Sequence, residues 1–149
     1  MRAAPLRRLA LAAALACAAA CTSLDVQPVP AAGYPIERLC IERNPNVVVE
    51  DLLPVIESGV ARHGIAARVV QAPAPADCEY TLWYDAKRRW DIRPVLGWVE
   101  LRVRHRGETI GGATWVARPS LSPFKWQSTE TRIGPVLDEL FAQFPRGAD

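Results

Sequence analysis

The chain has 149 residues, half of them hydrophobic, with 18 basic and 16 acidic side chains and a formal net charge of +2. This length suits one domain with a single hydrophobic core. Loss of residues 1–20 would remove three arginines and no acid, leaving 15 basic and 16 acidic residues. The remainder is therefore not polybasic, and we expect no nucleic-acid partner.

Residues 1–20 predict an export signal. The basic head MRAAPLRR precedes an apolar run over residues 9–16, and small residues follow it. This order is typical of a signal peptide. The run is too short for a membrane-spanning helix, which needs about 20 apolar residues.

Two cysteines, Cys17 and Cys21, follow small residues at the end of this run, as in bacterial lipoprotein signals whose cysteine is acylated. If Cys21 is the anchor, Cys17 leaves with the signal, and Cys40 with Cys78 forms the even pair expected in an oxidising compartment. If Cys17 is the anchor, Cys21 remains as a free thiol. We favour a palmitate-bearing anchor on Cys21 and a Cys40–Cys78 disulfide. Acylation of Cys17 and secretion without any anchor stay open as alternatives.

Residues 21–35 contain several prolines and no hydrophobic periodicity, so we expect a lipidated N-terminus followed by a flexible tether. Residues 36–149 then form the single folded domain. Its first part predicts a strand at 36–42, an amphipathic helix ended by Gly64, and a strand at 66–71. Pro54 is compatible with this helix only in its first turn.

Three alternating segments follow, at residues 80–90, 95–105 and 108–117, and they predict an antiparallel meander. Arg106-Gly107 has the composition of a two-residue hairpin turn. Apolar residues spaced by three or four from Ile133 to Phe144 predict a C-terminal helix, with Pro135 near its start. The expected fold class is α+β: five strands, with two helices on one sheet face and the first two strands parallel.

The expected turns also predict the strand registers. Pairing across Arg106-Gly107 places Trp98 opposite Trp115. A four-residue loop at 92–95 adds three opposed pairs, which are Asp85 with Arg102, Lys87 with Glu100, and Arg89 with Trp98. The helix-free face would then display Trp83, Trp98 and Trp115 among charged side chains.

These tryptophans permit two interpretations. They could stabilise an open sheet, or be covered by the tether or by the loop at 118–128. They could also form a binding face, since flat aromatic rings beside charged groups suit a protein partner or sugar rings. For a binding face we expect five contact residues: Trp83, Trp98, Trp115, Lys125 and Trp126.

No catalytic, cofactor or metal signature is present in the sequence. His63 and His105 have no zinc-like spacing to cysteines or carboxylates, and we expect both to be structural. There is no glycine-rich phosphate loop and no serine elbow. We therefore expect no cofactor, no metal and no enzymatic activity.

The chain resembles the Sbal family of small uncharacterised lipoproteins of Gram-negative bacteria. The matching residues are Cys21-Thr22-Ser23, Cys40-Ile41-Glu42 with Asn44-Pro45, Asp77-Cys78-Glu79-Tyr80, Trp90-Asp91, Lys125-Trp126-Gln127, and Pro135-Val136 with Asp138-Glu139-Leu140. The resemblance implies Cys21 as the anchor and, with Thr22 after it, an outer-membrane address with a periplasmic domain. It implies no activity.

Together these features predict a non-enzymatic envelope lipoprotein, held at a membrane by its lipid and binding another envelope component in an accessory or assembly role. The alternative is a lipoprotein that binds peptidoglycan or another glycan through its tryptophans.

Overall fold

The computed structural model describes residues 22–118 and 126–147, which form six strands and two helices. In chain order these are β1 (Thr22–Gln27), β2 (Arg38–Arg43), α2 (Leu52–Ala61), β3 (Ala66–Gln71), β4 (Tyr80–Asp91), β5 (Arg93–His105), β6 (Glu108–Ala117) and α3 (Thr129–Leu140). The predicted α+β class is confirmed, with one additional strand.

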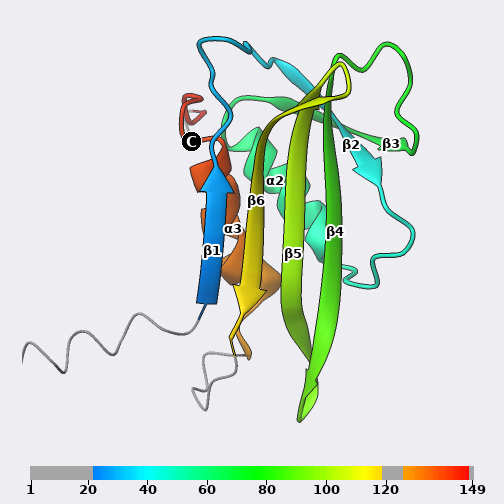
Figure 1. Cartoon of the computed structure of the whole chain (residues 1–149), viewed down its shortest axis with the longest axis vertical. Helices are drawn as coiled ribbons and strands as arrows, with labels where there is room; N and C mark the ends of the chain where they lie inside the picture. Colours follow the sequence, from blue (N-terminus) through cyan, green and yellow to red (C-terminus); the bar gives the residue numbers. More distant parts are fainter. Residues whose placement is uncertain (1–21, 119–125, 148–149) are drawn as a thin grey trace, which may run out of the picture.

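The six strands form one mixed sheet in the order β1-β6-β5-β4-β2-β3 (Figure 1). β2 is parallel to both β3 and β4, as the β-α-β order predicts, and the other pairings are antiparallel. Both helices lie on the same side of the sheet, behind it in Figure 1. Neither of the two described helices covers the opposite face of β6, β5 and β4.

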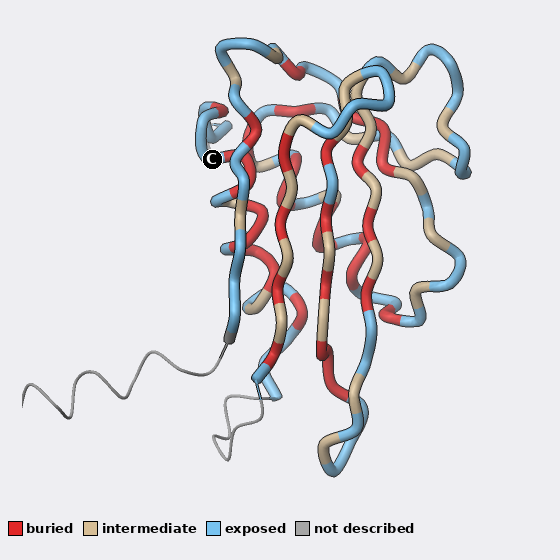
Figure 2. Tube along the Cα trace, in the orientation of Figure 1, coloured by how far each residue is buried: buried red, intermediate tan, exposed pale blue. Residues whose placement is uncertain are grey.

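The hydrophobic core fills the space between the helices and the covered face of the sheet. Buried and less buried residues alternate along β4, β5 and β6, as the red segments in Figure 2 show. The largest fully buried side chains come from strands and helices alike: Leu39, Ile41, Leu52, Ile56, Leu82, Leu101, Ile133, Leu137, Leu140 and Phe141. The alternation observed in the sequence thus has its predicted cause, a sheet with one apolar face.

The two helices pack closely against each other. A Cβ atom at Gly59 of α2 would lie 2.5 Å from Cδ1 of Leu137 in α3, so a larger residue here would force the Leu137 side chain to move. Pro54 lies in the first turn of α2, as predicted. α3 begins earlier than predicted, because the Ser128 hydroxyl caps it by accepting the Thr131 N–H at 3.2 Å. Pro135 is therefore an interior residue of α3, and its placement near the start was wrong.

The prediction of a flexible tether at 21–35 was wrong for most of its length. Residues Thr22–Gln27 form β1, which pairs with β6 along its whole length. The chain then continues to Val29, which is fully buried and donates its backbone N–H to the carbonyl of Leu140 at 2.9 Å. β1 occupies what would otherwise be an unpaired edge of β6, and such edges favour pairing with any available strand.

The predicted register between β5 and β6 was also wrong. His105 does face Glu108, but the pairing shifts between Val103 and Arg104. Trp98 consequently lies opposite Val116, and Val99 opposite Trp115. A shift of one residue moves a side chain to the other face of a sheet, so the bulge places Trp115 on the covered face.

The β4–β5 turn is tighter than predicted. Asp91 pairs with Arg93, so Ile92 alone forms the turn, and the expected four-residue loop at 92–95 does not exist. A second register shift lies between Lys87 and Arg88. As a result Lys87 faces Trp98, Asp85 faces Glu100, and Trp83 faces Arg102. All three predicted pairs across this hairpin were therefore wrong.

Cys40 and Cys78 form the predicted disulfide. The first predicted strand, at 36–42, begins two residues later, and the strands at 80–90 and 95–105 are longer than predicted. Those at 66–71 and 108–117 are confirmed. In the described part of the chain, no helix is long and apolar enough to cross a membrane.

Candidate functional site

The helix-free face of β4, β5 and β6, which we call the open face, carries two tryptophans with cations stacked over them. Trp83 lies on β4 and Trp98 on β5, and both are half-buried. The guanidinium of Arg102 lies 5.0 Å from the centre of the Trp83 ring. The Arg104 guanidinium lies 5.9 Å from the same ring, and the Lys87 ammonium 5.4 Å from that of Trp98. These distances allow cation–π attraction.

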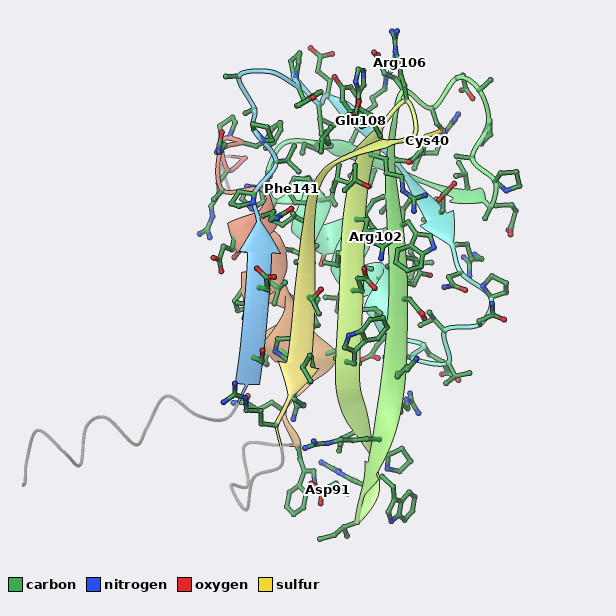
Figure 3. All side chains as sticks on the ribbon, viewed as in Figure 1. Cys40, Asp91, Arg102, Arg106, Glu108 and Phe141 are labelled. Carbon is green, nitrogen blue, oxygen red and sulfur yellow. A yellow bond between two sulfur atoms is a disulfide. The ribbon has the colours of Figure 1, made fainter. Side chains whose placement is uncertain are left out.

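Acidic side chains lie beside the two arginines. Arg102 donates from Nε to the Glu100 carboxylate at 2.7 Å. Arg104 lies 3.9 Å from the carboxylate of Glu42 on β2. Figure 3 shows Arg102 midway along the sheet. The face therefore combines aromatic rings with ordered guanidinium groups, the side chains most enriched at binding hot spots of protein interfaces.

Trp115 does not belong to this face, which corrects its prediction as a contact residue. It is buried in the core, with 4% of its surface exposed, and the Arg132 guanidinium of α3 lies 5.5 Å from its ring centre. Burial, and then the charge of nearby Arg89, lower the pKa of Arg132. The Trp115 ring thus packs between sheet and helix, where it stabilises the fold.

The remaining predicted contact residues lie elsewhere. Trp126 is 41% exposed and lies near the start of α3, with the Arg93 guanidinium 5.2 Å from its ring centre. It borders a hollow of about 240 Å³ that also involves Asp51 and Arg132, away from Trp83 and Trp98. Lys125 and the predicted anchor Cys21 lie outside the described residues.

A second polar cluster lies at the C-terminal end of β5, beside the turn that leads to β6 and close to the disulfide. The Glu79 carboxylate accepts hydrogen bonds from His105 and Arg106, both at 3.1 Å. These two partners, His105 foremost, hold the pKa of Glu79 below its ordinary value. The His105 ring stacks on Tyr80 with centroids 4.8 Å apart. Burial, and then the Glu79 charge, raise the pKa of Tyr80.

An open hollow of about 460 Å³ lies beside this cluster, along β2, β3 and the disulfide. Two of the charged groups on its wall pair with each other, since Arg68 donates to Asp77 at 2.9 Å. No nucleophile with an adjacent base lines this hollow.

His63 connects the two helices. It is buried, and its ring nitrogens lie 3.3 Å from the Phe144 carbonyl and 3.2 Å from the Asp138 carboxylate. Among the described residues, no group of three histidine, cysteine or acidic side chains could hold a metal ion.

Comparison with known proteins identifies the fold. No family model and no curated protein matches the chain. The PelC dodecamer from Paraburkholderia phytofirmans is similar, with a TM-score of 0.56 and 15% identity, over 80% of this chain and 98% of that one. A dodecamer of a point variant of that PelC gives a TM-score of 0.53 and 17% identity, over 80% and 96% of the two chains. At such low identity the likeness shows a shared fold alone.

Proposed function

We propose that the chain is a non-enzymatic envelope lipoprotein whose open face binds another component of the cell envelope, foremost a protein. The observation that carries this proposal is the pair of half-buried tryptophans with cations over their rings. Arginine and tryptophan together supply much of the binding energy in protein interfaces. The Cys40–Cys78 disulfide supports the envelope address, because such bonds persist in oxidising compartments.

The stacked cations favour a protein over a neutral glycan. A sugar ring binds tryptophan by lying flat on the ring, and it needs that ring face to be free. Arg102 and Arg104 lie over Trp83, and Lys87 lies over Trp98. With Trp115 buried as well, the open face offers less aromatic surface to sugars than the sequence predicts.

The solved PelC chains with this fold form dodecamers. The first protein partner that we consider is therefore a further copy of this chain. Light scattering of the purified full chain would measure its mass directly, and a mass above that of one chain would support self-assembly.

A photo-crosslinking experiment tests the open face in intact envelopes. A photoreactive residue replaces Thr114, which lies on the open face of β6, or Glu139, which is exposed on α3. We expect the Thr114 position to give one discrete protein adduct and the Glu139 position to give none. Trp98→Ala should abolish the adduct, because it removes the aromatic centre of the face. Equal labelling from both positions, or none from Thr114, would contradict the proposal.

Purified cell-wall sacculi test the glycan alternative. If the full chain co-sediments with sacculi and Trp98→Ala abolishes this, the open face binds peptidoglycan. If it does not co-sediment, binding to peptidoglycan is eliminated.

A further inference from the structure

The β4–β5 hairpin presents large apolar side chains to solvent at its tip. Trp90 is 76% exposed and Ile92 75% exposed, the two highest values among the exposed large hydrophobic residues. We call residues 88–96 the projecting hairpin, because they extend beyond the end of β6 in Figure 1. An aromatic and an aliphatic side chain exposed together at a hairpin tip form a small apolar patch surrounded by solvent.

The backbone at this tip is unfavourable for the residue it carries. Ile92 forms the turn alone and has a φ of 62°. A β-branched residue in this left-handed region is strained, whereas glycine or asparagine adopts it readily. The tip therefore carries an aliphatic side chain at a position whose backbone conformation disfavours isoleucine.

Basic side chains flank the apolar tip. Arg88 and Arg93 lie on its two strands, and Arg118 follows β6 at the same end of the sheet. All three are exposed. Apolar and aromatic side chains bordered by arginines are the composition of segments that rest on anionic membrane surfaces.

The chain enters the sheet at this same end. β1 begins at Thr22, which pairs with Ala117 at the end of β6, and Val116 in turn pairs with Trp98. At about 3.3 Å per residue, the tip of the projecting hairpin lies roughly 16 Å beyond the start of β1 along the strand direction. The predicted acylated Cys21 directly precedes Thr22. Because residues 22–27 are a paired strand, no flexible segment separates that anchor from the sheet.

We propose that the tip of the projecting hairpin contacts the phospholipid surface that holds the predicted lipid anchor. An anchor at the start of β1 places this end of the sheet next to the membrane, and the hairpin is the part that extends farthest toward it. Trp90 and Ile92 then enter the interfacial region while Arg88 and Arg93 meet anionic headgroups. The inference rests on the envelope address of the proposed function and not on the open face.

Quenching of tryptophan emission by brominated lipids tests this contact. The full chain, acylated in its host membrane and extracted in detergent, is reconstituted into vesicles of phosphatidylethanolamine and phosphatidylglycerol with brominated acyl chains. We expect Trp90→Phe to lose most of the quenching, because Trp90 is the ring at the tip. The matched variant Trp83→Phe, on the open face, should retain it. Equal quenching in wild type and Trp90→Phe, or none in the wild type, would overturn the proposal.

Ile92→Asn separates membrane contact from a structural role. Asparagine suits the positive φ, so the melting temperature should rise while quenching of Trp90 falls. A lower melting temperature with unchanged quenching would show that Ile92 serves the fold, and would refute the proposed contact.

The charges of Arg88 and Arg93 give a further test. The membrane contact and the binding role of the open face can also be refuted independently of each other. Replacing phosphatidylglycerol by phosphatidylcholine should weaken quenching in the wild type more than in Arg88→Gln/Arg93→Gln; equal weakening in both would contradict the role of these arginines. Loss of the Thr114 crosslink in Trp98→Ala concerns the open face alone and leaves this contact unaffected.

Discussion

The two ends of strand β5 are built in opposite ways. At one end the β5–β6 turn, Arg106-Gly107, is tied to neighbouring residues, and at the other the β4–β5 turn extends into solvent. Figure 3 shows this contrast, with Arg106 and Glu108 at one end of the sheet and Asp91 at the other. The same strand thus joins a fastened end to a projecting end.

The fastened end has several independent ties. Arg106 donates its backbone N–H to the Glu79 carbonyl at 2.9 Å and its side chain to the Glu79 carboxylate. His105 contacts the rings of Tyr80 and Tyr34. The disulfide joins Cys78, in the segment just before β4, to Cys40 on β2. The turn has positive φ at both residues and uses glycine at the second. Apart from the positive φ of Arg106, the local contacts at this end favour stability.

The tip of the projecting hairpin differs, although Arg89 and Arg93 beside it donate to the carbonyls of Ala117 and Trp126. It places isoleucine at a positive φ and leaves Trp90 and Ile92 exposed. Strained backbone positions cluster at functional sites, and this one is among the observations from which we infer the membrane contact. The difference teaches that the fastened end is built for stability, whereas the projecting end is the part for which we propose a contact outside the folded chain.

Loss of the disulfide should have the largest effect. The bridge closes a loop with a sequence separation of 38, and a loop of that size implies a stabilisation of about 4 kcal/mol. We expect Cys40→Ala/Cys78→Ala to lower the unfolding free energy by about this amount. Urea unfolding of wild type, oxidised and reduced, supplies the control, since reduction should reproduce the double variant. A loss well below 1 kcal/mol would show that the fastened end does not depend on this tie.

The ring cluster should have the next largest effect. His105→Ala removes the stacking on Tyr80 and the hydrogen bond to Glu79, so we expect a loss of about 1–3 kcal/mol. Trp90→Ala at the projecting end should change the free energy of unfolding by less than about 0.5 kcal/mol, because an exposed side chain has few contacts to lose. Chemical denaturation of both variants measures the difference. Equal losses would remove the contrast between the two ends.

Substitutions at the two turns should change the free energy of unfolding by smaller amounts and in opposite directions. Gly107 has a φ of 89°, so Gly107→Ala should cost about 1 kcal/mol. Ile92→Asn should instead stabilise the chain, by up to about 1 kcal/mol, since it relieves an unfavourable φ. Opposite shifts in thermal unfolding are expected. Shifts of the same sign would mean that the two turns are not built differently.

The smallest effect concerns pH. His105 and then Arg106 lower the pKa of Glu79 in the folded chain below its ordinary value of 4.5. A carboxyl with a depressed folded pKa stabilises the fold above its unfolded pKa, and this stability is lost as the pH falls through the folded pKa. The wild type should therefore lose slightly more stability on acidification below about pH 4.5 than Glu79→Gln does. Parallel pH profiles for the two proteins would contradict the assigned role of Glu79.

The sequence predicted much of the fold and less of the site. Alternation along residues 80–117 identified three strands, and cysteine parity identified the disulfide. Register was predicted from turn geometry. It was wrong for β5 and β6 because of the bulge beside Val103, and for β4 and β5 because Ile92 alone forms the turn and a second bulge lies beside Lys87. Each bulge adds a residue that no local pattern marks, so Trp115 was assigned to the wrong face while Trp83 and Trp98 were assigned correctly.

The strand β1 was missed for a related reason. Residues 22–27 have too short an alternation to predict a strand by themselves, and their pairing with β6 is formed between residues far apart in the chain. A neighbouring proline at position 28 favoured the interpretation as a tether. The feature that indicates β1 is the edge of β6, which would be unpaired without it. That edge becomes evident only when the order of all strands in the sheet is known.

By itself, then, the sequence determined the elements that depend on local periodicity: two helices, the meander, the Arg106-Gly107 turn and the apolar face of the sheet. The tertiary structure alone decided the strand registers, and with them the face on which Trp115 lies, as well as where β1 lies and which hairpin projects. Periodicity depends on neighbours a few residues apart, whereas register depends on pairings between distant strands, and one inserted residue reverses the face of every side chain beyond it.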